Sequence, residues 1–361
     1  MAAAVPAPRP QAHVLASPHG GGGGEADGEG MNLRPIRGQS NSLNGAKYPN
    51  PEKENTMELT QILGNTWAIE ADELIPFYKL DREHIILLDT GLEEEREALE
   101  QTFRDNGLTP VGVLCSHAHV DHCANSGYFQ KKYHLPVALT APEAGMCSSL
   151  LTLKCYFLTL PVSEVEKVGG AMIHTPDVII PPEDGYFPFQ GAEFRIIHTP
   201  GHSAGHICTV TPDGVLYVAD AMLSWEFLNA KLPYNLSHDM AIASREKLRH
   251  VACKKCVVAH RGIFEPDELG ELIQANHDLL ERRTEEIAAL IDRPMTISEI
   301  DREVCHLYQL FTKRPLRAMR FERNIRFLVE YLVDHGRLDI RCRGGVGYYT
   351  PVEPLTAPEE T

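Results

Sequence analysis

The chain has 361 residues, a formal net charge of −16, 43% hydrophobic residues and 23% charged residues. This acidity disfavours non-specific binding to a polyanion such as nucleic acid, because like charges repel. No apolar run approaches the roughly 20 residues of a membrane span and the first residues lack the pattern of a secretory signal, so we expect a cytoplasmic protein that does not bind membranes.

Residues 1–56 are expected to be a disordered N-terminal extension. Pro, Ala and Gly dominate this segment, and five consecutive glycines occupy positions 20–24. Such a composition buries too little apolar surface to offset the entropy lost on ordering. We therefore expect the folded part to begin near residue 57.

Short apolar strands separated by tight connections are expected next. The segments 66–69 and 77–80 have strand composition, and 84–88 (HIILL) is typical of a strand buried on both faces. This strand ends in Asp89. A helix that is acidic at its start, as the helix dipole favours, is predicted over residues 93–105.

The most informative stretch follows the next predicted strand, residues 111–115. Residues 116–122 read SHAHVDH, which places three imidazoles and one carboxylate within six positions. Neutral imidazole and ionised carboxylate are ligands that Zn²⁺ and related ions prefer. The position at a strand end also favours a ligand site. The stretch therefore predicts a site for one metal ion, and plausibly for two.

Residues 141–170 are apolar and mostly helical in pattern. The sequence leaves open whether they form a substrate pocket or lid, or plain core. Substrate identity is expected to depend on residues 141–190 and on the loop after Asp220, where Trp225, Tyr234 and His238 are candidates to line a pocket.

Three later strand ends each present one residue of metal-binding type. The strand before residue 200 leads to a turn at Gly201 that presents His202, residues 215–220 (VLYVAD) end in Asp220, and residues 255–260 (KCVVAH) end in His260. A lone strand-end histidine is usually satisfied locally. Together with the 116–122 stretch, however, the series indicates a shared site.

These residues, in this order, resemble the metallo-β-lactamase superfamily. The matching residues are Asp89, His117-x-His119-x-Asp121-His122, His202, Asp220 and His260. The resemblance covers roughly residues 57–265, and the TPGHSxGH pattern at 199–206 looks like the glyoxalase II branch. It implies an α/β fold, an αββα sandwich of two sheets with the site along one edge.

The resemblance also implies a centre of two divalent ions, Zn²⁺ or alternatively Fe or Mn²⁺. The implied ligands are His117, His119 and His202 for the first ion, Asp121, His122 and His260 for the second, and Asp220 bridging both. Asp89 would orient ligands, and His206 would be structural. The di-iron oxygen-reducing branch carries Glu at the position of His119, so this histidine favours hydrolysis over redox chemistry.

The ligand set itself predicts hydrolytic chemistry. Two ions that share a water lower its pKa from about 15.7 toward neutrality. The bridging hydroxide would be the nucleophile, and one ion would polarise the carbonyl or phosphoryl oxygen under attack. Asp121 is the expected catalytic residue, because its second oxygen can steer the attacking hydroxide.

Residues 266–361 are expected to form a separate C-terminal helical module. An amphipathic helix is predicted over 268–291, a capped helix begins at Thr296, and a further helix ends at Gly336. Residues 340–349 (IRCRGGVGYY) predict a β-hairpin. Helices followed by a basic hairpin resemble a winged helix, which occurs on a superfamily branch related to the lactamase-like endoribonucleases.

Two classes of enzyme therefore stay open. The first is a hydrolase of a small ester, thioester or related acyl substrate, as the glyoxalase II resemblance implies. The second is a phosphodiesterase or endoribonuclease whose winged helix binds nucleic acid. The overall acidity favours the small substrate. A third hypothesis is a regulatory binding module, against which the complete ligand set argues.

Seven arginines give the C-terminal module a local basic bias. They are Arg314, Arg317, Arg320, Arg323, Arg326, Arg341 and Arg343. Such a run is more often a solvated face or a homodimer contact, and Glu322 and Glu330 dilute it. Typical glyoxalase II proteins bind glutathione through a basic cluster, and residues 265–361 show no evident counterpart of it. The sequence therefore does not predict which thiol carries the acyl group of the substrate.

The nine cysteines favour reduced thiols over a disulfide framework, because their number is odd and they are scattered. Cys253 and Cys256 form the one CxxC, a weak metal or redox signal without a second motif. Cys123 directly follows the histidine cluster and is expected to serve packing.

Overall fold

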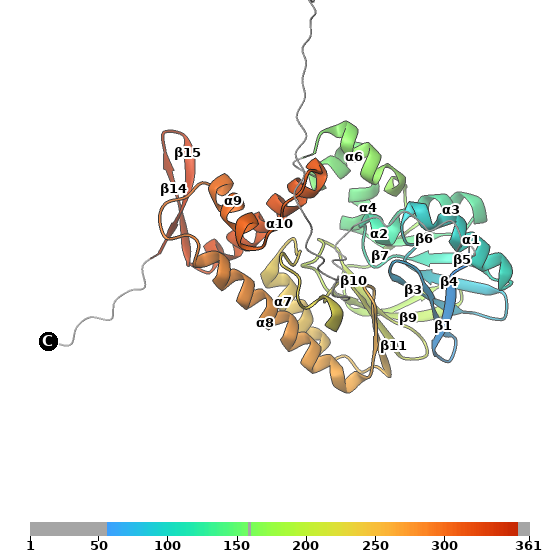
Figure 1. Ribbon diagram of the computed structural model, residues 1–361. Helices are drawn as coiled ribbons and strands as arrows, with labels where there is room; N and C mark the ends of the chain where they lie inside the picture. Colours follow the sequence, from blue (N-terminus) through green and yellow to red (C-terminus); the bar gives the residue numbers. More distant parts are fainter. Residues whose placement is uncertain (1–55, 158–159, 353–361) are drawn as a thin grey trace, which may run out of the picture. The chain divides into compact units, whose positions relative to one another are not determined.

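The computed structural model describes residues 56–157 and 160–352, and its fold is an αββα sandwich (Figure 1). Two sheets lie face to face, with helices on both outer faces. The predicted α/β sandwich is confirmed. The predicted N-terminal extension lies outside the described residues, apart from Thr56.

The first sheet has seven strands in the order β1 to β7. The strands are β1 (Glu58–Leu63), β2 (Thr66–Glu70), β3 (Leu74–Lys79), β4 (His84–Leu88), β5 (Thr109–Leu114), β6 (Val137–Thr140) and β7 (Val178–Ile180). Strands β1 to β4 are antiparallel, whereas β4 to β7 are parallel. The carboxyl ends of β4 and β5 therefore meet at one edge, where Asp89 and the 116–122 stretch follow them.

The second sheet has six strands in the order β13-β12-β11-β10-β9-β8. The strands are β8 (Gly185–Phe189), β9 (Ala192–His198), β10 (Ile207–Val210), β11 (Val215–Ala219), β12 (Lys255–Val258) and β13 (Gly262–Phe264). Only β11 and β12 pair in parallel, which brings the carboxyl ends of both strands to the same edge. Asp220 and His260 follow these two ends.

Successive side chains of a strand point to opposite faces of its sheet, and in this way the strands build the three apolar layers of the sandwich. In β4, Ile85 and Leu87 face the outer helices, whereas Ile86 and Leu88 face the second sheet. Tyr217 of β11 lies in the layer between the sheets and is 1% exposed. Because side chains alternate with a period of two, an apolar run such as HIILL fits a strand covered on both faces.

Helices cover both outer faces of the sandwich. On the first sheet lie α1 (Arg96–Asp105), α3 (Ser126–Tyr133), α4 (Ala141–Cys147), α5 (Leu150–Tyr156) and α6 (Val162–Gly169). On the second sheet lie α7 (His238–Leu248) and the first half of α8 (Leu269–Ala288) (Figure 1). The remaining short helices are η1 (Glu93–Glu95), α2 (Val120–Cys123), η2 (Gly170–Met172), η3 (Trp225–Phe227) and η4 (Pro266–Glu268).

The helical pattern predicted for residues 141–170 is confirmed by α4, α5 and α6. Its buried side chains, Leu153 and Val165 among them, belong to the apolar layer over the first sheet. Tyr156, at the end of α5, instead lies against His119. The segment therefore contributes both to the core and to the surroundings of the predicted site.

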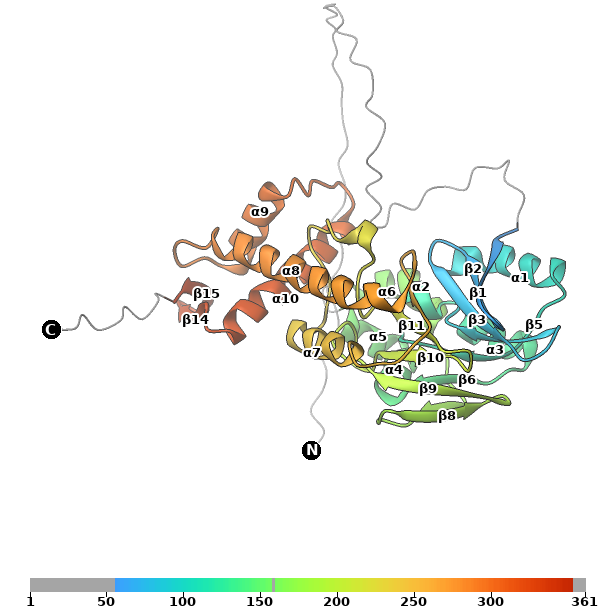
Figure 2. The ribbon, with the colours of Figure 1, turned by 90° about the horizontal axis from the view of Figure 1, so that it is seen from below.

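The C-terminal region continues from α8 (Figure 2). It comprises α9 (Ile297–Leu307), α10 (Pro315–Asp334) and a hairpin of β14 (Leu338–Arg343) and β15 (Val346–Pro351). A capping box at Thr296 begins α9, and the hairpin turns at Gly344 and Gly345, both as predicted. The hydrophobic core of the C-terminal region also includes Leu232, which precedes α7 in the chain. The division at residue 265 and the winged-helix interpretation stay predictions.

All nine cysteines are described, and none forms a disulfide. Cys123 is fully buried and its sulfur lies 3.9 Å from that of Cys147, as expected of a packing residue. Among the helices of residues 56–157 and 160–352, none combines the length and the apolar character that crossing a membrane requires.

Candidate metal centre

All seven predicted ligands lie in two neighbouring groups at one edge of the sandwich. The first group contains His117, His119, His202 and Asp220. The second contains Asp121, His122 and His260, together with Glu73, which the sequence analysis missed. Within each group one ligand atom from every residue lies within 4.8 Å of the others. The loops after β5, β9, β11 and β12 thus meet as predicted, and ligation itself stays a prediction.

Asp220 lies between the two groups. Its Oδ2 is 3.3 Å from Nε2 of His202 in the first group and 3.3 Å from Nε2 of His260 in the second. Its Oδ1 is 3.4 Å from Nε2 of His122. One carboxylate therefore contacts imidazoles of both groups, which is the arrangement that a bridging ligand requires.

Nε2 of His117, of His119 and of His122 lacks a hydrogen-bond partner in the described part of the chain, and of the three only Nε2 of His122 has ion-pair contacts, with Glu73 and Asp220. All three atoms are buried. Buried polar atoms are normally satisfied, so such atoms call for an explanation. The donor set of imidazoles and carboxylates fits divalent ions, which would satisfy these nitrogens.

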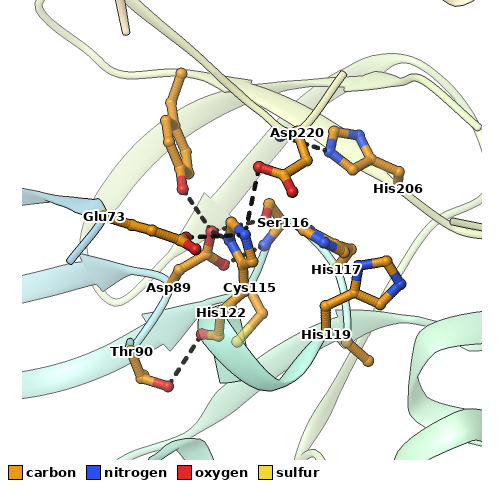
Figure 3. Close-up of polar contacts among 12 residues, drawn as sticks. Glu73, Asp89, Thr90, Cys115, Ser116, His117, His119, His122, His206 and Asp220 are labelled. Carbon is orange, nitrogen blue, oxygen red and sulfur yellow. Dashed lines mark hydrogen bonds and ion pairs between the residues drawn. The ribbon is translucent and has the colours of Figure 1, made fainter. Parts of the chain in front are cut away.

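Asp89 is hydrogen-bonded to the ring of His122, and its predicted role in orienting a metal ligand stays a prediction. Its Oδ2 accepts hydrogen bonds from Nδ1 of His122 (2.9 Å), the Ser116 hydroxyl (2.7 Å) and the Tyr217 hydroxyl (2.6 Å), while Oδ1 accepts from the Ser116 amide (2.7 Å). With Nδ1 donating, Nε2 of His122 is the ring nitrogen left for a metal ion. Figure 3 shows Asp89 next to His122 and Ser116, with dashed lines for these contacts.

A second buried carboxylate, Glu143 at the start of α4, ties together the two loops that carry histidines. It accepts hydrogen bonds from the Ala118 amide (2.8 Å) in one loop and from the Ser203 hydroxyl (2.7 Å) and Gly205 amide (2.6 Å) in the other. Burial raises the pKa of Glu143 above its ordinary value. Nothing in the local sequence marked this glutamate.

His206 is structural, as predicted. It lies against His117, but its Nδ1 is 2.8 Å from the Thr199 hydroxyl and its Nε2 accepts the backbone amide of Asp220 at 3.3 Å. Both ring nitrogens are therefore engaged by protein. The contact holds the backbone from which the Asp220 carboxylate projects.

The carboxylates and imidazoles shift each other's proton affinity. Burial opposes ionisation of Asp220, but His260, His122 and His202 outweigh it and hold the pKa of Asp220 well below its ordinary value. Burial also lowers the pKa of His202, to about 4. An ionised carboxylate beside a neutral imidazole is the protonation state that metal binding needs.

Two tyrosines and one arginine lie beside the first group. The Tyr156 ring lies 5.0 Å from that of His119, and the Tyr234 ring lies 5.2 Å from that of His202. Arg323 of α10 lies over the Tyr234 ring at 4.1 Å and donates a hydrogen bond to the Tyr156 hydroxyl at 3.3 Å. The C-terminal region thus supplies a positive charge near the centre.

The other two pocket candidates from the sequence are Trp225 on η3 and His238 on α7. Trp225 is 41% exposed on η3. His238 is buried at the start of α7, where its ring packs on Tyr331, and burial lowers its pKa to about 3. Of the three predicted lining residues, Tyr234 has ring contacts with predicted ligands, and a pocket role for the other two stays a prediction.

Comparison with known proteins agrees with this geometry. The sequence profile of the metallo-beta-lactamase superfamily matches residues 65–260, which include every predicted ligand. A β-lactamase domain protein from Burkholderia ambifaria has a similar structure, with a TM-score of 0.62 at 16% identity over 82% of this chain and 94% of that chain. At this identity the similarity demonstrates a common fold alone.

Several curated relatives have hydrolase or thioesterase names. The chain is 23% identical to an atrochrysone carboxyl ACP thioesterase of Pseudocercospora fijiensis over 75% of this chain and 73% of that protein. It is 24% identical to a hydroxyacylglutathione hydrolase of Halorhodospira halophila over 50% of this chain and 63% of that protein. The chain spans 64% and 52% of the length of two further curated relatives.

Proposed function

Because the chain belongs to the metallo-beta-lactamase superfamily, we propose that it is a dinuclear metal-dependent hydrolase of a small ester or thioester. The observation that carries this proposal is the pair of ligand groups joined by Asp220. Two divalent ions bound there would lower the pKa of a shared water and polarise the substrate carbonyl. The thioesterase and hydroxyacylglutathione hydrolase relatives support acyl transfer to water.

We assign the residues as the sequence resemblance implies. His117, His119 and His202 would hold one ion, Asp121, His122 and His260 the other, and Asp220 both. Zn²⁺ suits the imidazole-rich first group. Asp121 also takes the catalytic role, because its carboxylate can accept a proton from the attacking water. Although burial opposes it, His122 lowers the pKa of Asp121, so this carboxylate is ionised at neutral pH.

Arg323 supports a substrate that carries a negative charge near its acyl group. The guanidinium lies beside Tyr156 and Tyr234, whose rings contact imidazoles of the first group. A planar guanidinium recognises a carboxylate or phosphate through paired hydrogen bonds. The two phenol hydroxyls next to it would orient the same group.

The phosphodiesterase hypothesis is the alternative, favoured by the order of three helices and a hairpin after β13. The charges of that region argue for the small substrate. Arg326 pairs with Glu322 and Arg341 with Asp339, so these two arginines are partly neutralised. The formal net charge of −16 also opposes binding of a polyanion.

The test combines metal analysis of the purified full-length protein with hydrolysis assays on a thioester panel and a labelled RNA. We expect about two ions per chain, thioester cleavage without RNA cleavage, and loss of turnover in His119→Ala and Asp220→Asn. His84→Asn, which alters an exposed histidine paired with Asp81 far from the centre, is the matched control and should keep full activity.

Cleavage of RNA alone would favour the phosphodiesterase. Full activity after exhaustive chelation would contradict both hypotheses, because both depend on bound ions.

A further inference from the structure

We propose that Glu73 is an additional ligand of the second metal ion and makes this site favour Mn²⁺ relative to the first. The inference rests on the proposed dinuclear centre and adds a residue that the sequence resemblance does not include. The second ion would be held by Glu73, Asp121, His122 and His260 together with Asp220.

The fold delivers Glu73 to the centre through backbone contacts. The residue lies in the tight connection between β2 and β3, where its carbonyl accepts the Ala71 amide at 3.2 Å. The next residue, Leu74, donates its amide to the carbonyl of Ala259 at 2.8 Å. Ala259 directly precedes His260, so a backbone hydrogen bond joins the Glu73 turn to the loop of a predicted ligand.

The Glu73 side chain reaches the imidazoles of the second group. Its Oε2 lies 3.1 Å from Nε2 of His122 and its Oε1 lies 3.4 Å from Nδ1 of His260. The residue is 6% exposed. Figure 3 shows Glu73 pointing toward His122 from the strand side. Because Nδ1 of His122 is bound to Asp89, Glu73 meets the nitrogen that is left to coordinate an ion.

The charges around Glu73 call for a cation. Glu73 and Asp121 belong to one group of ligand atoms, and Asp220 contacts two imidazoles of the same group. In the described part of the chain, the ion-pair partners of Glu73 and Asp220 are histidines, and neither forms an ion pair with Lys or Arg. Buried like charges are stable together only when compensated, and a divalent ion supplies that compensation.

The extra carboxylate makes the two sites chemically unequal. The first group offers three imidazoles and one carboxylate, whereas the second offers two imidazoles and, with Asp220, three carboxylates. Carboxylate oxygens suit Mn²⁺ better than imidazoles do, and imidazoles suit Zn²⁺ and Fe. The second site should therefore discriminate less in favour of Zn²⁺ than the first.

A different role for Glu73 would be to orient His260 by a hydrogen bond to Nδ1. The conservative substitution Glu73→Gln separates the two roles, because the amide keeps an acceptor oxygen but loses the charge that binds an ion. If Glu73 only orients the ring, Glu73→Gln should weaken the binding of Zn²⁺ and of Mn²⁺ to the second site equally, whereas loss of a carboxylate ligand should weaken Mn²⁺ binding more than Zn²⁺ binding.

The experiment measures metal content and affinity in full-length wild type, Glu73→Gln, Glu73→Asp and the matched control Glu70→Gln. Glu70 ends β2, is exposed and bonds to Thr60, away from the centre. Each metal-free protein is titrated with Zn²⁺ and with Mn²⁺ against a chelator, and ions per chain are counted by mass spectrometry. Circular dichroism of the metal-free proteins checks that each variant is folded.

We expect wild type and Glu70→Gln to bind two ions. In Glu73→Gln the second ion should bind about 100-fold more weakly, with a larger loss for Mn²⁺ than for Zn²⁺, while the first is unchanged. Glu73→Asp keeps the charge on a shorter side chain, so its affinity for the second ion should lie between those of wild type and Glu73→Gln. The proposal would be overturned by wild-type affinity for two ions in Glu73→Gln, by an equal loss of Zn²⁺ and Mn²⁺ affinity in this variant, or by fewer than two ions in wild type.

These readouts do not depend on turnover. If wild type binds two ions and Glu73→Gln loses one, but no acyl substrate is cleaved, the Glu73 proposal stands and the proposed function fails.

Discussion

Replacing Asp89 with Asn should weaken the metal centre without distorting the backbone. Asp89 has a positive φ of 74°, which Asn tolerates better than most residues, and the two side chains have the same shape. The substitution removes the negative charge and one of two acceptor oxygens. Any loss of metal affinity or stability in Asp89→Asn therefore results from the changed hydrogen bonds of the side chain and not from a change in its size.

The magnitude follows from the four hydrogen bonds that Asp89 accepts. In the better orientation, the Asn oxygen faces His122, Tyr217 and the Ser116 hydroxyl, while its amide group faces the Ser116 amide. Three bonds then lose about 1 kcal/mol each because the acceptor is neutral, and one buried donor loses its partner at about 1–3 kcal/mol. The total is about 4–6 kcal/mol, shared between folding stability and metal affinity.

The assay is competition of the metal-loaded protein with a chromophoric chelator, together with thermal unfolding of metal-free protein. We expect affinity for the ion bound by His122 to fall about 10- to 100-fold, because its ring is no longer held by an ionised partner. Tyr217→Phe removes just one donor to Asp89 and is the matched control, with a smaller loss. Wild-type affinity in Asp89→Asn, or an equal loss in Tyr217→Phe, would refute the reasoning.

Three further predictions concern the backbone, a buried acid and the ions. In Gly201→Ala the new Cβ would lie 2.3 Å from the Ala241 amide nitrogen, at a φ of +136°. Because the backbone of Ala241 cannot move aside, we expect the free energy of unfolding, measured by chemical denaturation, to fall by several kcal/mol. Stability near that of wild type would contradict the clash. Burial, with the charge of Glu322, raises the pKa of Asp301 to about 7 from an ordinary 3.8, so the folded state holds a proton that the unfolded state releases between these values. The stability of the wild type therefore falls as pH rises through that window. The free energy of unfolding of Asp301→Asn should equal that of wild type near pH 4 and exceed it by about 1 kcal/mol near pH 8, after allowance for the partial exposure of Asp301. A difference between the two proteins that does not change with pH in calorimetry would exclude this cause. Chelation should lower the Tm by about 5–10 °C, since ions at 100 times their Kd stabilise by about 2.7 kcal/mol, and an unchanged melting curve would argue against bound ions.

The sequence was sufficient for the sandwich and for most of the centre. Alternating or continuous apolar runs such as residues 84–88 identify strands because side-chain direction repeats every two residues. Ligand-type residues at the ends of such strands were recognisable because a β/α architecture gathers those ends at one edge. The ordered series from Asp89 to His260 therefore predicted the fold and the gathering of these residues at one edge, and their binding of metal stays a prediction.

Only the tertiary structure revealed the carboxylates that surround these ligands. Glu73 follows Asp72 in a polar turn and Glu143 follows Pro142 at a helix start, where acidic residues are common and carry no signal. Their significance arises from contacts with residues far away in the chain, such as Ala259 beside Glu73 and Ser203 beside Glu143.

Arg323 makes the same point for the substrate side of the centre. In the sequence it is one of seven basic residues whose interpretation as a solvated face was reasonable. Packing of α10 against the sandwich instead turns it to Tyr156 and Tyr234. Local pattern determines which segments form strands and helices, because it depends on neighbours a few residues apart. Which remote side chains share a buried site depends on how two sheets and their helices pack, and that is decided by the whole fold.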